Sequence, residues 1–318
     1  MTFFSSCFDS NLRNRNEGNT VGIINEDRFI ETVHMKGLQI SLLASGDGTE
    51  VIYHKLQPGT RWGLEPQDGW DALEFLQILS GGLKVLSHNH LKDLQAGDSF
   101  HECPIKDHYF FESIGETEFL FITSQPVFHF YSKISNELKE LAVSIEEKDG
   151  YTKDHCDRIK TMATLVGEKA GLTSKQLMRL NLASFLHDIG KVKIPISILQ
   201  KPGKLTSEEW ELMKLHTVFG KQILVETKLP SLIEASKIVE QHHERFDGLG
   251  YPYNLQGDQI STEASIISVV DAFDAMTTNR IYQSARTREE AFEEILRCRG
   301  TMYNPYIVDI FLSLKDKI

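Results

Sequence analysis

The chain has 318 residues, 41% of them apolar, and a formal net charge of -11 at pH 7. At roughly 150 residues per domain, this length predicts about two domains. The acidic balance argues against a nucleic-acid polymer as partner, because neutralising phosphates requires a basic face. No apolar run approaches the ~18 residues that cross a bilayer, and the start lacks the pattern of a secretory signal. Four well-separated cysteines without a CxxC pair favour a reducing, cytoplasmic location.

The first part of the chain has the pattern of β-structure behind a polar leader. Residues 1–35 are polar at their start, and we expect them to be partly disordered. From residue 36 to 132, short apolar runs alternate with turn signals, as in LQISLLA before SGDG and EVIYHKL before QPG. Strands this short and regular are typical of a β-sandwich or β-barrel. The sequence therefore predicts an all-β domain over 36–132.

Residues 133–150 are expected to form a connecting helix. Ile134, Leu138, Leu141 and Ile145 recur at helical spacing and form one apolar stripe. The stripe could pair across a homodimer and pass a movement to His155 just downstream. It could equally pack against its own domain, and the sequence leaves both interpretations open.

The remainder, 151–318, has the pattern of an all-α domain. Thr206 and Glu209 form a capping box before EWELMKLHTVFGKQIL. Further helices are expected at 174–187, 231–243, 263–277, 288–299 and 305–314. Two long Gly/Pro-rich segments, 192–205 and 245–261, interrupt them. Loops of that length in a helical domain are usually functional.

The histidines of this half suggest a metal site. Five lie near expected helix ends or on apolar helix faces: His155, His187, His216, His242 and His243. Asp188 adjoins one of them, and Asp271 falls inside the apolar run ISVVDAFDAM, where an unpaired carboxylate is costly. A lone histidine on an apolar face is more often a core residue, but here the joint pattern counts. Imidazoles and carboxylates suit first-row divalent ions, and the number of ligands favours two ions about a shared carboxylate.

Four stretches then resemble the HD-GYP family, a branch of the HD-type metal-dependent phosphohydrolases. HDIGK (187–191) and HHERFDGLGYP (242–252) look like its two signatures, and KPGKLTSEE (201–209) and DAFDAMTTNRIY (271–282) resemble its other motifs. The resemblance covers about 149–318. It implies hydrolysis of cyclic di-GMP to linear pGpG or on to GMP, through a hydroxide that bridges two metals.

The resemblance also implies metal ligands. One ion would be held by His187, Asp188 and Asp271. The other would be held by Asp188, His216, His242 and His243, with His155 as a further ligand of the site. Some members of the family carry a glutamate for a third metal where this chain has Tyr151. We therefore expect two divalent ions, iron or manganese.

Substrate-binding roles follow from the same resemblance. Lys191, also expected to be catalytic beside Asp188, and Arg280 would contact the phosphates. A loop that shapes the nucleotide pocket would be formed by Gly248, Gly250, Tyr251 and Pro252. The plain alternative for this loop is an ordinary Gly/Pro turn between helices.

The segment 73–123 resembles a cupin. Glu74 and Gly81 have the spacing of its first motif, and LQAGDSFHECPIKDHYFF resembles its second. The HxH pair of cupin enzymes is absent, because the corresponding stretch reads PQDGWDA. This departure favours a ligand sensor or dimerisation module over a second enzyme. His88 and His90 are expected to be a solvated pair in a turn.

Alternatives to a cyclic di-GMP phosphodiesterase stay open. One is an HD phosphohydrolase that acts on another cyclic dinucleotide. The other is a protein that binds cyclic di-GMP, or docks to a signalling partner through the GYP loop, without cleaving the messenger. We expect neither a membrane nor a nucleic-acid polymer as partner, and we expect a homodimer.

Overall fold

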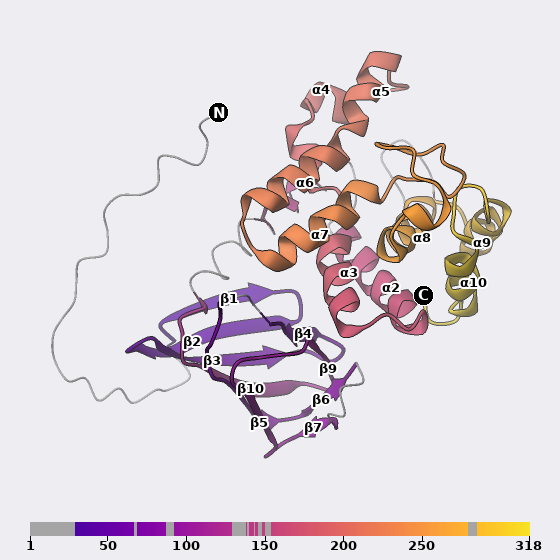
Figure 1. Ribbon diagram of the computed structural model, residues 1–318. Helices are drawn as coiled ribbons and strands as arrows, with labels where there is room; N and C mark the ends of the chain where they lie inside the picture. Colours follow the sequence, from indigo (N-terminus) through magenta and orange to yellow (C-terminus); the bar gives the residue numbers. More distant parts are fainter. Residues whose placement is uncertain are drawn as a thin grey trace.

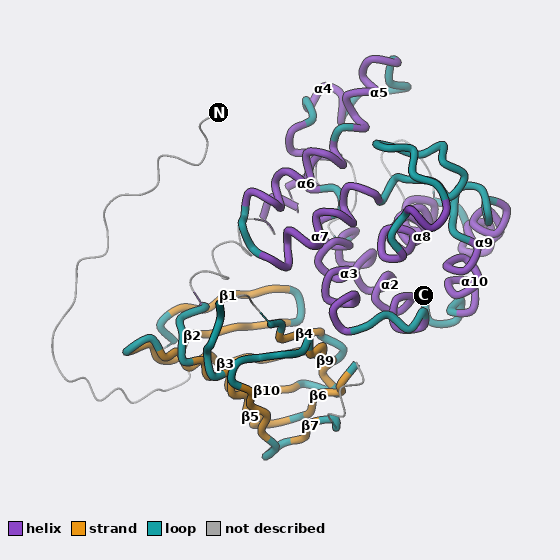
Figure 2. Tube along the Cα trace, viewed as in Figure 1, coloured by secondary structure: helices purple, strands orange, loops and turns teal. Residues whose placement is uncertain are grey.

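The computed structural model describes residues 29–66, 69–86, 92–128, 138, 140–142, 144–145, 148–149, 154–278 and 285–318. Strands gather in one lobe and helices in a second (Figure 1), and colouring by secondary structure separates the same two lobes (Figure 2). The expected fold class, an all-β domain followed by an all-α domain, is confirmed.

The β-domain consists of two antiparallel sheets. Its strands are β1 (Glu31–Met35), β2 (Leu38–Gly46), β3 (Thr49–Leu56), β4 (Arg61–Leu64), β5 (Glu74–Ser80), β6 (Gly82–Val85), β7 (Leu94–Gln95), β8 (Ser99–Glu102), β9 (Tyr109–Ser113) and β10 (Thr117–Thr123). One sheet has the order β1-β2-β3-β10-β5-β8, and the other has the order β4-β9-β6-β7. This two-sheet architecture agrees with the cupin resemblance. The domain begins earlier than residue 36, because β1 pairs with β2 from Glu31 onward.

Aromatic rings fill the space between the sheets. Alternate residues of β3 are buried, as expected for a strand with one face on the core. His54, one of them, stacks on Phe119 with ring centroids 4.6 Å apart, and Trp62 lies 5.0 Å from Phe119. The interior around His54 is therefore a packed core. His88 and His90 fall outside the described residues.

The helical domain packs around one apolar core. Its elements are α2 (His155–Lys169), α3 (Ser174–Leu186), the 3-10 helix η1 (Ile189–Lys193), α4 (Ile196–Leu199), α5 (Ser207–Lys214), α6 (His216–Glu226), α7 (Pro230–Gln241), the 3-10 helix η2 (Gly257–Gln259), α8 (Thr262–Thr277), α9 (Arg288–Arg297) and α10 (Pro305–Ser313). The capping box of Thr206 and Glu209 is present at the start of α5. The helix expected from that box is divided at Leu215 into α5 and α6.

The apolar stripe of the connecting segment packs on its own domain. Ile145 is buried in the core of the helical domain, and Leu138 and Leu141 pack against that core. Ile134 lies outside the described residues. The described part of the stripe therefore packs within its own domain, as the second interpretation of the sequence expects, and the homodimer stays a prediction.

Ion pairs join the two domains. Arg61 of β4 contacts Glu168 of α2 at 2.9 Å. Lys36, in the turn between β1 and β2, contacts Asp154 at 3.0 Å, directly before the first residue of α2. The β-domain thus touches both ends of the helix that begins with His155.

Candidate metal centre

Most of the expected ligands lie where helix ends converge. His187 and Asp188 follow the last residue of α3, and His216 is the first residue of α6. His242 and His243 follow α7, and Asp271 lies within α8. Gly190 allows the end of α3 and the start of α6 to approach closely. A Cβ at Gly190 would stand 1.9 Å from the carbonyl oxygen of His216, so only glycine fits there.

Backbone carbonyls orient three of the imidazoles. Nδ1 of His187, His216 and His242 lies 2.9, 2.7 and 2.6 Å from the carbonyl oxygens three residues earlier. A carbonyl only accepts, so Nδ1 donates and the proton stays on that nitrogen. In the neutral imidazole Nε2 then keeps its lone pair, the arrangement found in histidines that bind metals.

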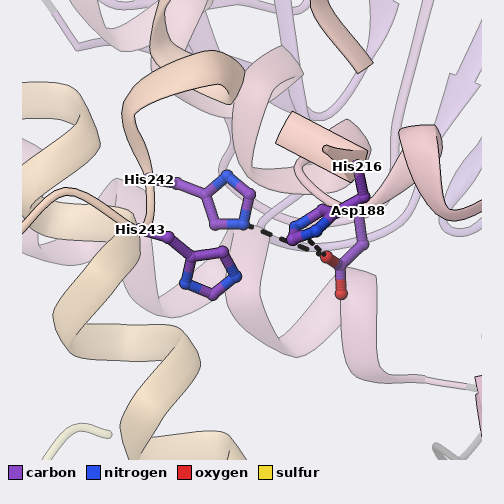
Figure 3. Close-up of side chains that lie close together, drawn as sticks. All are labelled: Asp188, His216, His242 and His243. Atoms are coloured by element: carbon purple, nitrogen blue, oxygen red, sulfur yellow. Dashed lines mark ion pairs between the residues drawn. The ribbon is translucent and has the colours of Figure 1, made fainter. Parts of the chain in front are cut away.

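Four side chains form the first group, which contains Asp188, His216, His242 and His243 (Figure 3). Oδ1 of Asp188 lies 3.4 Å from Nε2 of His216 and 3.9 Å from Nε2 of His242. One ligand atom from each of the four side chains lies within 4.8 Å of the others. The spacing leaves room for a single cation among them.

The second group contains His155, His187 and Asp271. Oδ1 of Asp271 lies 3.6 Å from Nε2 of His155 and 3.8 Å from Nε2 of His187. Oδ2 of Asp188 lies 3.4 Å from the same nitrogen of His187. The two oxygens of Asp188 therefore face different groups, as a carboxylate shared between two ions would.

Buried polar atoms without a hydrogen-bond partner test whether a metal fits. Among the described residues, such atoms include Nε2 of His187, His216 and His242, and Oδ1 of Asp188 and Asp271. Burying a polar atom without a partner costs about 1–3 kcal/mol, so several at one place require an explanation. Nitrogen and carboxylate donors suit first-row divalent cations, and the residues present fit such ions.

Electrostatics keep most of these imidazoles neutral. Burial lowers the pKa of His216 to about 3 and that of His242 to about 4, and it holds the pKa of His243 well below its usual value. A neutral imidazole is the form that binds a metal.

The region between the two aspartates favours a positive charge. Burial alone would lower the pKa of His187, but the carboxylates of Asp188 and Asp271 raise it to about 9. Burial alone would raise the pKa of Asp188, but Lys191 and His187 hold it well below its usual range. Asp188 is therefore ionised, as a metal ligand must be.

The pattern of the sequence did not reveal two supporting carboxylates. Asp274 accepts a hydrogen bond from Nδ1 of His155 at 2.7 Å and is paired with Arg158 at 2.5 and 2.8 Å. The sequence feature that could have identified Asp274 is its position three residues after Asp271 on the same apolar helix. Asp149 accepts a hydrogen bond from Lys191, and this contact spans 42 residues that no local pattern could connect.

Lys191 is buried in this structure. Its Nζ lies 2.6 Å from Asp149 and 2.7 Å from Asp188, so the ammonium group is held between two carboxylates. An ammonium group carries three N–H donors, so these two contacts alone do not use up its capacity to meet a phosphate oxygen. Arg280, the other expected phosphate contact, lies outside the described residues, as does Tyr151.

The loop of residues 248–252 is held against the first group. A Cβ at Gly250 would stand 2.3 Å from the backbone nitrogen of Arg245, and Gly248 has φ +79. The carboxylate of Glu244 accepts hydrogen bonds from the backbone of Tyr253 and Leu255 at 2.7 and 3.1 Å. The loop is therefore a fixed structure rather than a loose turn.

Tyr251 is the residue of this loop that lies beside the first group. The ring of Tyr251 lies 5.0 Å from that of His243 and 6.3 Å from that of His216. Pro252 follows it and is half-buried. The aromatic ring thus borders the group that contains Asp188.

Sequence comparison gives the class of protein. Residues 139–307 match the family described as the HD domain, so this chain belongs to the HD domain family. Its β-domain is similar to a cupin domain of a transcriptional regulator from Enterobacter cloacae, with 15% identity over 29% of this chain and 99% of that chain and a TM-score of 0.25.

Particular relatives are more specific. A cyclic di-GMP phosphodiesterase of Thermotoga maritima is 38% identical over 197 residues, which are 62% of this chain and 54% of the relative. A 3'3'-cGAMP-specific phosphodiesterase 2 of Vibrio cholerae is 37% identical over 177 residues, which are 56% of this chain and 34% of the relative. The match spans between about a third and half of these relatives' own length.

Within the described residues, the structure contains no helix that is both long and apolar enough to span a bilayer.

Proposed function

We propose that this chain is a metal-dependent phosphodiesterase that hydrolyses cyclic di-GMP to linear pGpG, GMP or both. The observation that carries the proposal is the shared carboxylate: Asp188 directs one oxygen toward His216 and His242 and the other toward His187. The names of the two relatives support a cyclic dinucleotide as substrate.

Two ions, iron or manganese, would be held by the two groups. One would lie among Asp188, His216, His242 and His243, and the other among His155, His187, Asp271 and Asp188. When bound, such ions lower the pKa of a coordinated water and neutralise charge that develops on a phosphodiester.

The chain's own residues would prepare the site. The backbone carbonyls keep the protons of three imidazoles on Nδ1, so that Nε2 faces the centre. Lys191 adds a fixed positive charge beside Asp188, at a place where a non-bridging phosphate oxygen is attracted. The ring of Tyr251 borders the first group on one side.

The test is an assay on protein purified without oxygen, after its metal content has been measured. We expect linear product from cyclic di-GMP with iron or manganese, and none from an Asp188→Ala variant. Tight binding of cyclic di-GMP without product at saturating metal would contradict the proposal and support a receptor without catalytic activity.

A second substrate has specific support. The relative from Vibrio cholerae is named for 3'3'-cGAMP, a hybrid of guanine and adenine nucleotides. Turnover of cyclic di-GMP and 3'3'-cGAMP should be compared at equal concentration. We expect faster turnover of cyclic di-GMP, and the reverse order would assign the chain to the hybrid messenger.

We place the phosphodiesterase in residues 151–318. We place a sensor in the β-domain of residues 36–132, together with strand β1 that precedes it. A cytoplasmic location, a homodimer and a signalling partner at the GYP loop stay predictions.

A further inference from the structure

Trp210 is not needed for the core of the helical domain. It lies in α5, a helix that contributes no buried side chain, and 46% of its surface is exposed. The helix is held at its start by the reciprocal capping box of Thr206 and Glu209, and Lys201 contacts the same Glu209 at 2.5 Å. The indole is thus a large apolar group whose position packing does not explain.

The position of Trp210 relates it to the metal centre. Its ring lies 6.1 Å from the ring of Tyr251 with an interplanar angle of 81°. Tyr251 in turn lies 5.0 Å from His243 at 35°. The ring of Tyr251 therefore contacts both the exposed indole and a candidate ligand of the first group.

The corner between these two rings is fixed. The backbone N–H of Tyr251 donates to the carbonyl of His243 at 3.2 Å, and Gly250 presses against the backbone of Glu244 and Arg245. Tyr251 cannot move away from His243 without breaking this close packing. The exposed indole of Trp210 therefore stands nearly perpendicular to a ring that is held in place.

We propose that Trp210 stacks on one nucleobase of the cyclic dinucleotide, with Tyr251 as the wall that sets the position of the base. The proposal rests on the proposed function. An exposed aromatic face is the usual platform for an unpaired base, because every base presents a flat π-surface. In a nucleotide, one sugar lies between the base and its phosphate. In this chain, one tyrosine lies between Trp210 and the candidate ligand His243. A base on Trp210 would direct its phosphodiester toward the first group.

Steady-state kinetics on cyclic di-GMP test this role. Stacking on a remote base contributes equally to the bound substrate and the transition state, so its loss raises KM and spares kcat. We expect a KM about 10- to 100-fold higher in Trp210→Ala, which is the range of one lost stacking contact. Trp210→Phe, which keeps an aromatic face, should recover most of the loss. Tyr306→Ala, which removes another exposed aromatic residue, from α10, is the matched control and should leave KM unchanged.

A Trp210→Ala variant with the KM of the wild type would overturn the proposal. A variant whose kcat falls while its KM is unchanged would also overturn it, because Trp210 would then act through the position of the loop.

A binding measurement separates this proposal from the proposed function. Cyclic di-GMP is titrated into metal-loaded protein, and tryptophan fluorescence is recorded immediately after mixing. We expect quenching in the wild type that is lost in Trp210→Phe, even if the wild type forms no linear product and the proposed function fails. Equal quenching in both proteins, or none in the wild type, would show that no base stacks on Trp210.

Discussion

Asp274 holds His155 through a hydrogen bond of 2.7 Å to Nδ1, while Arg158 holds Asp274 from the other side with two nitrogens. Burial would raise the pKa of Asp274, but Arg158 and His155 lower it to about 2, so this carboxylate is ionised at neutral pH. The pair fixes the proton of His155 on Nδ1 and directs Nε2 toward Asp271, the arrangement that supports histidine ligands in metal sites.

The first prediction therefore concerns Asp274→Asn. An amide keeps the shape of the side chain but loses the charge that orients His155. Loss of such a supporting carboxylate typically weakens metal affinity by about 10- to 100-fold. Titration with Mn²⁺ should show this loss at one of two sites. Affinities equal to those of the wild type at both sites would mean that His155 does not bind a metal.

The second prediction concerns Gly190→Ala. The added methyl would overlap the carbonyl of His216, and backbone on both sides leaves it no room. Such overpacking typically lowers the free energy of unfolding by about 1–3 kcal/mol, and here it would also displace His216. Denaturant unfolding checks the first effect and metal titration the second.

Gly46→Ala serves as the control for that substitution. Nothing lies within 4 Å of a Cβ at Gly46. This substitution should therefore change the free energy of unfolding by no more than about 0.5 kcal/mol. Equal stability of the two variants would show that η1 and α6 are not packed as closely as described.

The third prediction concerns stability and pH in the β-domain. Burial lowers the pKa of His54 to about 3 from its ordinary value of 6.5. Between these two values the unfolded chain binds a proton that the folded chain does not, so stability rises with pH. The contribution of neutral His54 to the free energy of unfolding is complete above about pH 6.5. At pH 5 this contribution has decreased by about 2 kcal/mol.

A variant with an apolar ring at this position removes the effect. Unfolding of wild type and His54→Phe, followed from pH 5 to pH 7, should give a smaller slope for the variant. Identical slopes for wild type and His54→Phe would mean that His54 is solvated rather than part of the core.

The sequence named the candidate ligands but not the residues that support them. Histidine and aspartate at helix ends are a local signal, and their joint spacing indicated a shared site. The contact between Lys191 and Asp149 joins two distant segments, so only the fold reveals it. Periodicity likewise identified Leu138, Leu141 and Ile145 as one apolar face, but it could not say that the helical domain covers them. Strand β7 has only two residues, too few for an alternating pattern to be recognised.

Metal stoichiometry tests the central claim most directly, because Asp188 faces both groups and Asp271 faces one. Wild type, Asp271→Asn and Asp188→Asn should be loaded with Mn²⁺, freed of excess metal and analysed for bound ions per chain. We predict two ions for the wild type, one for Asp271→Asn and fewer for Asp188→Asn than for Asp271→Asn. Equal metal content in the two variants, or none in the wild type, would contradict a centre built around a shared carboxylate.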